Sequence, residues 1–560
     1  MNLNRRHLFS AGLGAMAVAS LAACQQQKPG EGGGRGSDPQ GSTQTLPSTA
    51  WERADYSAVK DGGTLTLSVA QVPDNWNSDQ TQGNLADLSD IREPQGYGQF
   101  SKASEAGEIS FNPDYIVEAT LTSTEPQVVT VKMNPKAVWE DGTPITIKDL
   151  QAYATALSGK DKAYQLVSTK GWEDIKEVKQ TADEFTGEIH FANKVVDWQP
   201  LCYPSLPASI SSDPEVFNNG YTAKGTPSCG PFKLKSFDKT AIILERNPNW
   251  WGQKPKLESI IFRVLTQQQQ PSSFGNGEID VVDIANGDVY NTAKKRSDVV
   301  IQKSNGVTWT HLTINTERIT DLEVRKAIAY GVNREVIGAA VISPLETPVV
   351  LLNDVIYLPG QKGYIDPWNG EVKYDKAKAE EILQAAGYAK GSDGVYAKDG
   401  KPLAFSVTVP ADAKSNIDRA TQVQKDLNAI GFKIDLQTVP SDNYFKEYVQ
   451  PHNFDLVTFS WVGTAYPHSG INLFSPKESK QNFTGWGDEK VDKLGVEAYQ
   501  EFDKEKRIKV TNDFSKALLN AFPIIPFYVT PKVMGLKKGL VNFGARQFES
   551  VDWTTVGFKA

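Results

Sequence analysis

Cysteine and histidine are scarce in this chain, and their scarcity limits the kinds of active site it can hold. The 560 residues include three cysteines and five histidines, with no C-x-x-C pair and no H-E-x-x-H segment. Protein zinc sites are commonly built from such short spacings. We therefore expect no metal site and no cofactor. The histidines beyond His7 are interpreted as structural or surface residues: His190, His311, His452 and His468.

Two further catalytic motifs are missing. The chain has no G-x-S-x-G segment of the kind that presents a nucleophilic serine. Its nearest approach to a phosphate-binding loop, from Gly394 to Lys401, has glycines one residue too far apart. Paired carboxylates follow no spacing rule in sequence, so an exported hydrolase stays open as an alternative function. Our main expectation is a protein that is not an enzyme.

The chain also lacks a block of basic residues and, after residue 24, any long apolar run. The formal net charge is −8. Nucleic-acid binding requires clustered Lys and Arg, so we exclude that class of partner. A membrane-spanning helix needs roughly 20 apolar residues in a row, and none is expected in the mature chain.

What the sequence does have begins at its amino terminus. Arg5 and Arg6 precede a short apolar run that ends in Leu21-Ala22-Ala23-Cys24. This pattern predicts a signal peptide over residues 1–23 and resembles a bacterial lipobox, in which the cysteine thiol carries lipid. The alternative is an ordinary secreted protein. The paired arginines leave both general and twin-arginine export open. We expect the mature chain to be extracytoplasmic and anchored to the outer face of the membrane through lipid on Cys24.

The next segment is rich in Gln, Gly, Ser, Pro and Thr, and we interpret residues 24–58 as the lipidated cysteine followed by a flexible tether. Ordered structure is expected from about Asp61. Residues 64–69 alternate like a half-buried strand, and a polar loop containing Trp76 follows them.

The clearest structural unit lies between Leu403 and Leu436. Apolar residues alternate over 403–409, recur with helical spacing over 420–430 and alternate again over 432–436. This is the pattern of a βαβ crossover, so part of the sheet is parallel. A further strand, 454–459, leads into the loop 461–467. Because ligands of α/β sheets bind at the ends of strands, this loop is the first candidate binding surface.

Cysteine and tryptophan supply two further predictions. If Cys24 is acylated, Cys202 and Cys229 remain as one possible disulfide, with two buried thiols as the alternative. Of the 12 tryptophans, Trp76 and Trp461 are the ones we place at a ligand site.

Several segments together resemble family 5 of the solute-binding proteins of ABC importers, which includes oligopeptide-, dipeptide- and nickel-binding members. The resemblance covers nearly all of the chain from residue 61 onward. The segments that carry it are 139–144 (WEDGTP), 148–150 (KDL), 229–232 (CGPF), 246–251 (RNPNWW), 277–280 (GEID), 315–316 (NT), 324–328 (VRKAI) and 385–388 (AAGY).

This resemblance implies a fold and a function. The fold would be α/β and two-lobed, a periplasmic-binding-protein-like type II fold of family 5 with an extra subdomain. Lobe I would comprise residues 59–305 and 531–560, with the subdomain at about 100–225, and lobe II would comprise 306–530. The protein would be a monomer that binds a peptide or peptide-like solute between the lobes and delivers it to permease and ATPase partners. A lipid-tethered sensor with the same fold is a further alternative.

The expected ligand-binding residues come from both lobes and should face each other: Asn75, Trp76, Asn77, Trp461, Val462, Gly463, Thr464 and Tyr466. Peptide-binding members of the family carry an aspartate in the loop that corresponds to residues 460–466 here, and this aspartate pairs with the ligand ammonium. Here Thr464 stands at that position, and a neutral hydroxyl cannot make that charge-assisted bond. Blocked or modified peptides therefore become plausible ligands. Alternatively, an ammonium partner comes from elsewhere, such as Asp74 or Asp79.

Overall fold

A computed structural model describes residues 46–560 of the chain. The predicted signal peptide and the lipid-bearing Cys24 lie outside these residues. Among the described residues, no helix is both long enough and apolar enough to cross a membrane.

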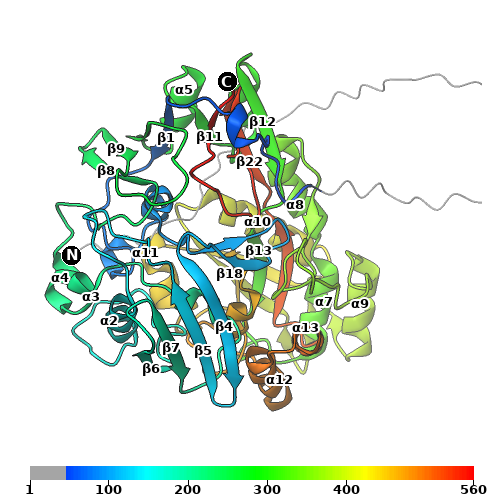
Figure 1. Cartoon of the computed structure of the whole chain (residues 1–560). Coiled ribbons are helices and arrows are strands. Elements are labelled where there is room, and N and C mark those ends of the chain that lie inside the picture. Colours follow the sequence, from blue (N-terminus) through cyan, green and yellow to red (C-terminus); the bar gives the residue numbers. More distant parts are fainter. Residues whose placement is uncertain (1–45) are drawn as a thin grey trace, which may run out of the picture.

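The amino-terminal part of the chain forms two adjoining sheets, at the top of the view in Figure 1. One contains, in order, β1 (Thr64–Val69), β10 (Ser259–Val264), β9 (Ala241–Arg246) and β8 (Phe232–Phe237). The other contains β11 (Val281–Asp283), β22 (Lys532–Lys537) and β12 (Val299–Ser304). The late strand β22 thus pairs with two earlier strands, so the chain returns to this region near its carboxyl end.

A separate antiparallel sheet, drawn in cyan and teal in Figure 1, has the order β4 (Ile116–Thr124), β5 (Gln127–Met133), β7 (Thr186–Phe191) and β6 (Ile175–Gln180). Helix α2 (Ile147–Leu157) packs against it and buries Ile147 and Leu150 beside Val129 of β5. The helix starts at a capping box in which Thr146 and Asp149 satisfy each other's backbone N–H groups.

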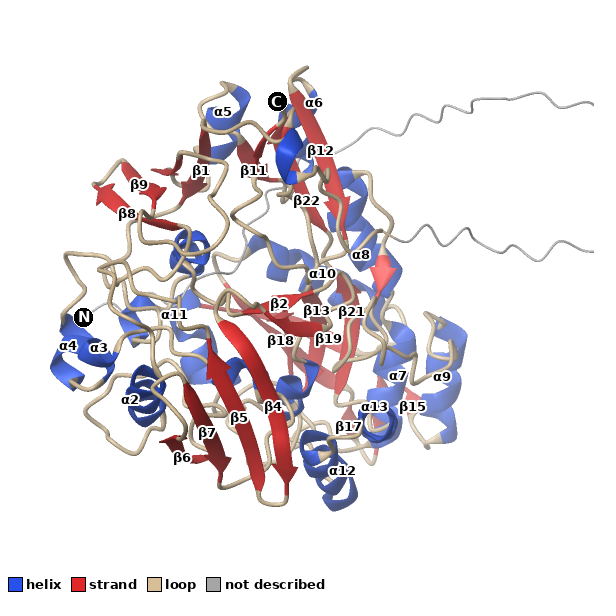
Figure 2. Ribbon diagram, viewed as in Figure 1, coloured by secondary structure: helices blue, strands red, loops and turns tan. Residues whose placement is uncertain are grey.

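The largest sheet has six strands. Their order is β14 (Val350–Leu351), β21 (Ile524–Val529), β13 (Thr308–Ile314), β20 (Leu456–Val462), β18 (Ala404–Pro410) and β19 (Lys433–Val439). Strands β18 and β19 are parallel and are joined by α10 (Lys414–Asn428), so the predicted βαβ crossover is confirmed. Figure 2 shows further helices beside this sheet: α7 (Leu322–Gly331), α8 (Arg334–Ile342), α9 (Lys376–Ala385), α12 (Glu489–Gln500) and α13 (Lys504–Leu519).

The remaining elements are short. The helices are α1 (Ala86–Arg92), α3 (Ala208–Ser211), α4 (Pro214–Asn219), α5 (Gln270–Gly275), α6 (Gly287–Lys294), α11 (Ser441–Asn443), the π-helix η6 (Tyr444–Val449) and the 3-10 helix η7 (Pro467–Leu473). The strands are β2 (Ser101–Ala103), β3 (Ile109–Phe111), β15 (Ala389–Lys390), β16 (Tyr396–Lys398), β17 (Lys401–Pro402), β23 (Leu540–Val541) and β24 (Gly557–Phe558). Further 3-10 turns are η1 (Tyr56–Ala58), η2 (Thr81–Gly83), η3 (Glu93–Gln95), η4 (Gln199–Leu201) and η5 (Ser343–Leu345).

The chain enters the six-stranded sheet between β12 and β13 and leaves it between β21 and β22. These connections lie next to the lobe boundaries expected at residues 305 and 530. We propose that they divide the chain into the two lobes, with the β4-β5-β7-β6 sheet as the subdomain of lobe I. Each of these regions has its own buried hydrophobic core.

Residues 46–58 differ from the expected flexible tether. Trp51 is buried with 8% of its surface exposed, and the Ala50 N–H donates to the Ala545 carbonyl at 2.9 Å. Arg53 forms an ion pair with Glu549 at 2.8 Å. The composition of this segment is polar, but the burial of Trp51 together with these two polar contacts holds it against the carboxyl-terminal residues.

Candidate ligand-binding site

Strand β20 ends at a loop whose backbone is held in place by hydrogen bonds. The Gly463 N–H donates to the Val307 carbonyl at 2.8 Å, and the Gln361 side-chain amide donates to the Thr464 carbonyl at 3.1 Å. The Thr464 hydroxyl accepts the Tyr466 N–H at 3.0 Å, so it closes its own turn. Val462 is 68% exposed. The loop that the sequence singled out is therefore preorganised, with an apolar side chain directed to solvent.

Trp461 lies one residue before the exposed end of β20 and is partly buried. Its ring stacks on Phe483, with centroids 5.8 Å apart and planes inclined by 10°, and meets Phe459 edge-on at 5.2 Å. The buried His311 ring lies nearly parallel to it at 6.3 Å. These contacts fix the orientation of the indole, which a ligand-binding aromatic residue requires.

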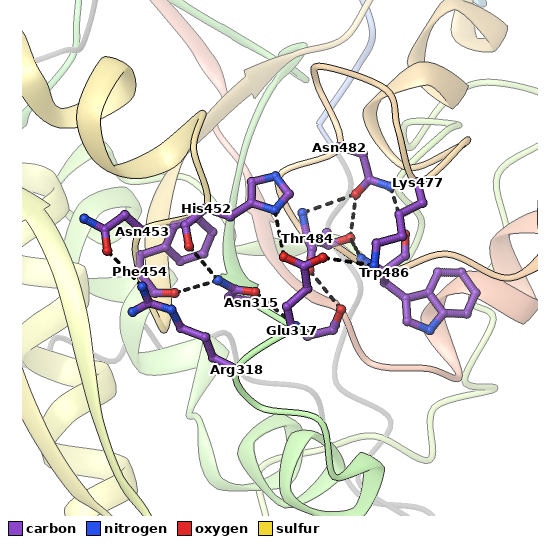
Figure 3. Close-up of polar contacts among 11 residues, drawn as sticks. Asn315, Glu317, Arg318, His452, Asn453, Phe454, Lys477, Asn482, Thr484 and Trp486 are labelled. Carbon is purple, nitrogen blue, oxygen red and sulfur yellow. Dashed lines mark hydrogen bonds and ion pairs between the residues drawn. The ribbon is translucent and has the colours of Figure 1, made fainter.

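A polar network holds Phe483 beneath Trp461. Asn482 and Thr484 flank Phe483 in the chain, and Figure 3 shows the side-chain amide of Asn482 in contact with Thr484 and Trp486 of the same loop. The Asn482 amide donates to the Trp486 carbonyl at 2.9 Å, and the Thr316 hydroxyl donates to the Thr484 carbonyl at 3.0 Å. The segment 474–486 is thereby tied to the end of β13, and its aromatic ring is held in a defined position.

The expectation that Asn75, Trp76 and Asn77 face the ligand is not met. Trp76 is only 1% exposed and packs against Phe237 of β8 at 4.7 Å. Both asparagines are fully buried and act as structural donors to α4. The Asn75 amide binds the Asn218 carbonyl at 2.7 Å and the Asn77 amide binds the Phe217 carbonyl at 2.9 Å. These three residues belong to the core of the amino-terminal region.

The loop after β20 instead meets a different part of the amino-terminal region. We call this line of contacts the seam. The His468 ring lies 3.3 Å from the Asp197 carboxylate, and the Lys170 ammonium donates to the Ser469 carbonyl at 2.5 Å. The Val196 N–H donates to the Tyr499 carbonyl at 3.2 Å. Burial raises the pKa of Tyr466, in the same loop, to about 12.

A cavity of about 390 Å³ opens on the amino-terminal side of the seam. Lys170 belongs both to the seam and to the cavity wall, so the two are continuous. The wall contains both aromatic rings and small hydroxyl residues. The polar and aromatic residues of the wall include Ser78, Asp79, Tyr97, Phe100, Tyr153, Ser168, Lys170 and Trp172. An apolar wall with a few polar groups is typical of a small-molecule site.

Asp79 is the acidic residue of the cavity wall, and its two oxygens already have partners. The Tyr153 hydroxyl donates to one at 2.8 Å and the Tyr97 hydroxyl to the other at 3.2 Å. Burial raises the pKa of Asp79, while nearby Arg92 and the two hydroxyls oppose that rise. Asp79, one of the two alternatives for an ammonium partner, is thus engaged within the protein. Asp74, the other, is exposed and does not line the cavity.

The two remaining cysteines are free thiols in the structure, so the possible Cys202–Cys229 disulfide is not formed. Cys202 is 0% exposed and its thiol donates to the Trp198 carbonyl at 3.7 Å. Cys229 is 4% exposed and lies where Gly96 and Gly230 bring two backbone segments together. Burial raises the pKa of Cys229 to about 12. Among residues 46–560, no group of three His, Cys, Asp or Glu side chains could hold a metal ion.

Comparison with known proteins decides the family. The family model of bacterial extracellular solute-binding proteins, family 5, matches residues 112–482. The chain belongs to this family. The oligopeptide-binding protein OppA of Mycobacterium tuberculosis is 32% identical over 512 residues, which cover 90% of this chain and 86% of that protein. OppA of Bacillus subtilis is 24% identical over 436 residues, covering 73% of this chain and 77% of that protein.

Solved structures of other binding proteins share this fold. The periplasmic EDTA-binding protein EppA matches with a TM-score of 0.80 at 23% identity, over 93% of this chain and all (100%) of that one. AppA of Bacillus subtilis, solved with a nonapeptide, matches with a TM-score of 0.72 at 20% identity, over 90% of this chain and 100% of that one. The family and fold class inferred from sequence are confirmed.

Sequence reasoning about this solute-binding protein missed Lys170 and Asp197. Each lies in a segment without a family motif or regular hydrophobic spacing, and their partners are 299 and 271 residues away in the chain. A signal for such contacts exists only in three dimensions.

Proposed function

We propose that this protein is the extracytoplasmic receptor of an ABC importer and binds a peptide or peptide-like solute. The observation that carries the proposal is the similarity to oligopeptide-binding OppA at 32% identity over 90% of the chain. The cavity beside the seam and the fixed indole of Trp461 support it, because both are features of a ligand site.

In this proposal the solute lies between the lobes, close to the loop 462–469. Closure forms the seam contacts of Lys170 and His468, and opening breaks them. Each of these contacts is one polar interaction, which costs little free energy to break. Closure is therefore reversible, as delivery of the solute to a permease requires. The permease and ATPase are separate proteins. We propose that the chain acts as a monomer and by binding rather than by catalysis.

The most direct test is native mass spectrometry of the protein purified from its own host. We expect a retained solute whose mass fits a peptide or a modified peptide, and the same solute should bind the emptied protein in titration calorimetry. A solute without amide-linked residues would contradict the proposed ligand class. Turnover of the retained solute by the pure protein would instead favour the exported hydrolase.

Localisation needs its own experiment. We propose that Cys24 carries the lipid anchor, with residues 1–23 removed. Cys24→Ala should abolish incorporation of labelled palmitate and either release the protein from the membrane fraction or leave the precursor unprocessed. A matched Cys202→Ala variant should label normally. Equal labelling of the wild type and Cys24→Ala would refute the anchor.

A further inference from the structure

Lys170 lacks an anionic partner although it is partly buried. Its ammonium donates to the neutral Ser469 carbonyl at 2.5 Å. No carboxylate oxygen of the described residues lies within 4.0 Å of the ammonium nitrogen, the limit for an ion pair. Burial lowers the pKa of Lys170, and the carboxylates of Asp197 and Glu173 offset this only from a distance. An ammonium has three donors, and one is used here. The remaining donors are available to a ligand.

The surroundings of Lys170 favour an anion over a cation. The other charged group of the cavity wall is Asp79. It accepts hydrogen bonds from two tyrosine hydroxyls, and the nearby positive charge of Arg92 favours its carboxylate form. Ser168, two residues before Lys170, lines the same wall. Its hydroxyl oxygen accepts a hydrogen bond from the backbone N–H of Lys170 at 3.1 Å. Its O–H can therefore still donate. A carboxylate at this point would accept bonds from both side chains.

We propose that Lys170 and Ser168 form an anion subsite at the seam, and that the protein selects peptide-like solutes by a free carboxylate. This inference rests on the proposed function and extends it by naming the end of the ligand that is recognised. Trp172 and Phe100, which line the same cavity, supply apolar surface for the adjoining ligand side chain.

The loop after β20 also favours recognition of the carboxyl end of a solute. The Thr464 hydroxyl already accepts the Tyr466 N–H, and the chain has no carboxylate between Asp455 and Glu478. The ammonium of a free amino terminus has no carboxylate to pair with in that loop, whereas a free carboxylate can pair with the Lys170 ammonium. Peptides with a blocked amino terminus and a free carboxyl terminus therefore fit both ends of the site.

The test compares two libraries of N-acetylated pentapeptides of the same sequences, one with free carboxyl termini and one with carboxyl-terminal amides. Titration calorimetry should give about tenfold or greater preference of the wild type for the free acids, and Lys170→Met should remove that preference. Lys170→Arg should retain most of it. The matched control is Lys162→Met, because Lys162 also donates to a carbonyl, that of Gly159 at 2.7 Å, but is exposed and does not line the cavity.

The outcomes separate this inference from the function on which it rests. Binding of both libraries with equal affinity, or an unchanged preference in folded Lys170→Met, would overturn the carboxylate subsite and leave peptide binding intact. Binding of neither library by the emptied wild type, together with binding of its retained non-peptide solute, would overturn both. Circular dichroism and thermal unfolding of each variant identify any that fails to fold. If Lys170→Met does not fold, the comparison of free acids with amides in the wild type still tests the subsite.

Discussion

The indole of Trp461 lies almost parallel to the phenyl ring of Phe483, with centroids 5.8 Å apart, although the two residues come from different segments. Trp461 lies one residue before the end of β20, and Phe483 lies in a loop whose backbone is held by hydrogen bonds of Asn482 and Thr484. The indole also contacts the rings of Phe459 and His311 and stays partly exposed, so its orientation is fixed while some of its surface is free to contact a ligand.

The first prediction concerns this ring. Trp461→Ala should weaken solute binding by about 1 to 4 kcal/mol, the range for an aromatic anchor, while the protein stays folded. Asn482→Ala should have a smaller effect in the same direction, because it loosens the support of Phe483 without touching the ligand. Calorimetry with the retained solute measures both. Unchanged affinity in Trp461→Ala would remove this residue from the site.

Trp76 should behave in the opposite way. The residue is 1% exposed and packs on Phe237, so Trp76→Ala should lower the free energy of unfolding by about 3 to 5 kcal/mol. Any folded fraction should bind the solute with normal affinity. Urea unfolding followed by calorimetry separates the two effects, and a stable variant with weak binding would mean that Trp76 contacts the solute.

The contrast between these two tryptophans shows how far sequence patterns reach. The βαβ unit from Leu403 to Leu436 was predictable because its periodicities record which faces are buried. The loop after β20 could be named as a candidate binding surface because ligands of α/β sheets bind at the ends of strands. Trp76 stands among polar residues and looked exposed, but its neighbours Asn75 and Asn77 satisfy the carbonyls of a helix about 140 residues away. Local polarity does not distinguish solvent from a distant backbone partner.

The cavity was beyond sequence reasoning for the same reason. Its wall combines residues from three segments, 78–100, 153–172 and 200–205, none of which carries a catalytic or binding motif. Asp79 was identifiable as a carboxylate but not as one already engaged by Tyr97 and Tyr153. Partners of this kind are set by packing and not by spacing along the chain.

Acid should destabilise the protein through His311. Burial, with help from Arg419, lowers the pKa of His311 from 6.5 to about 3 in the folded state. The unfolded chain therefore takes up a proton below pH 6.5 that the folded state refuses until about pH 3. Stability should fall as the pH drops through this window, by up to about 2 kcal/mol between pH 6.5 and pH 5.

Urea unfolding at pH 7.5 and pH 5 measures this loss. His311→Gln should reduce the difference between the two pH values, whereas His190→Gln, a change on the partly exposed β7, should leave it as in the wild type. A pH dependence that is the same in all three proteins would show that His311 is not its source.

The cysteines should react as two buried thiols. In a Cys24→Ala background, alkylation without reductant should label neither Cys202 nor Cys229 in the native protein and both in denaturant, because burial raises both thiol pKa values. Mass spectrometry counts the labels. A denatured, unreduced protein that accepts no label would mean that the two are bonded after all.

The last prediction tests the polarity of the site at Thr464. Its hydroxyl accepts the Tyr466 N–H at 3.0 Å, and the side chain is exposed. Aspartate and asparagine both offer an oxygen that can accept the same N–H, so Thr464→Asp and Thr464→Asn should keep the turn and differ mainly in charge. Thr464→Asp should gain affinity for peptides with free amino termini relative to their N-acetylated forms, and Thr464→Asn should not. Calorimetry with paired peptides gives the comparison. If both variants bind the two peptide forms as the wild type does, Thr464 does not face the ligand terminus, and the absence of a carboxylate in this loop says nothing about which end of the solute is recognised.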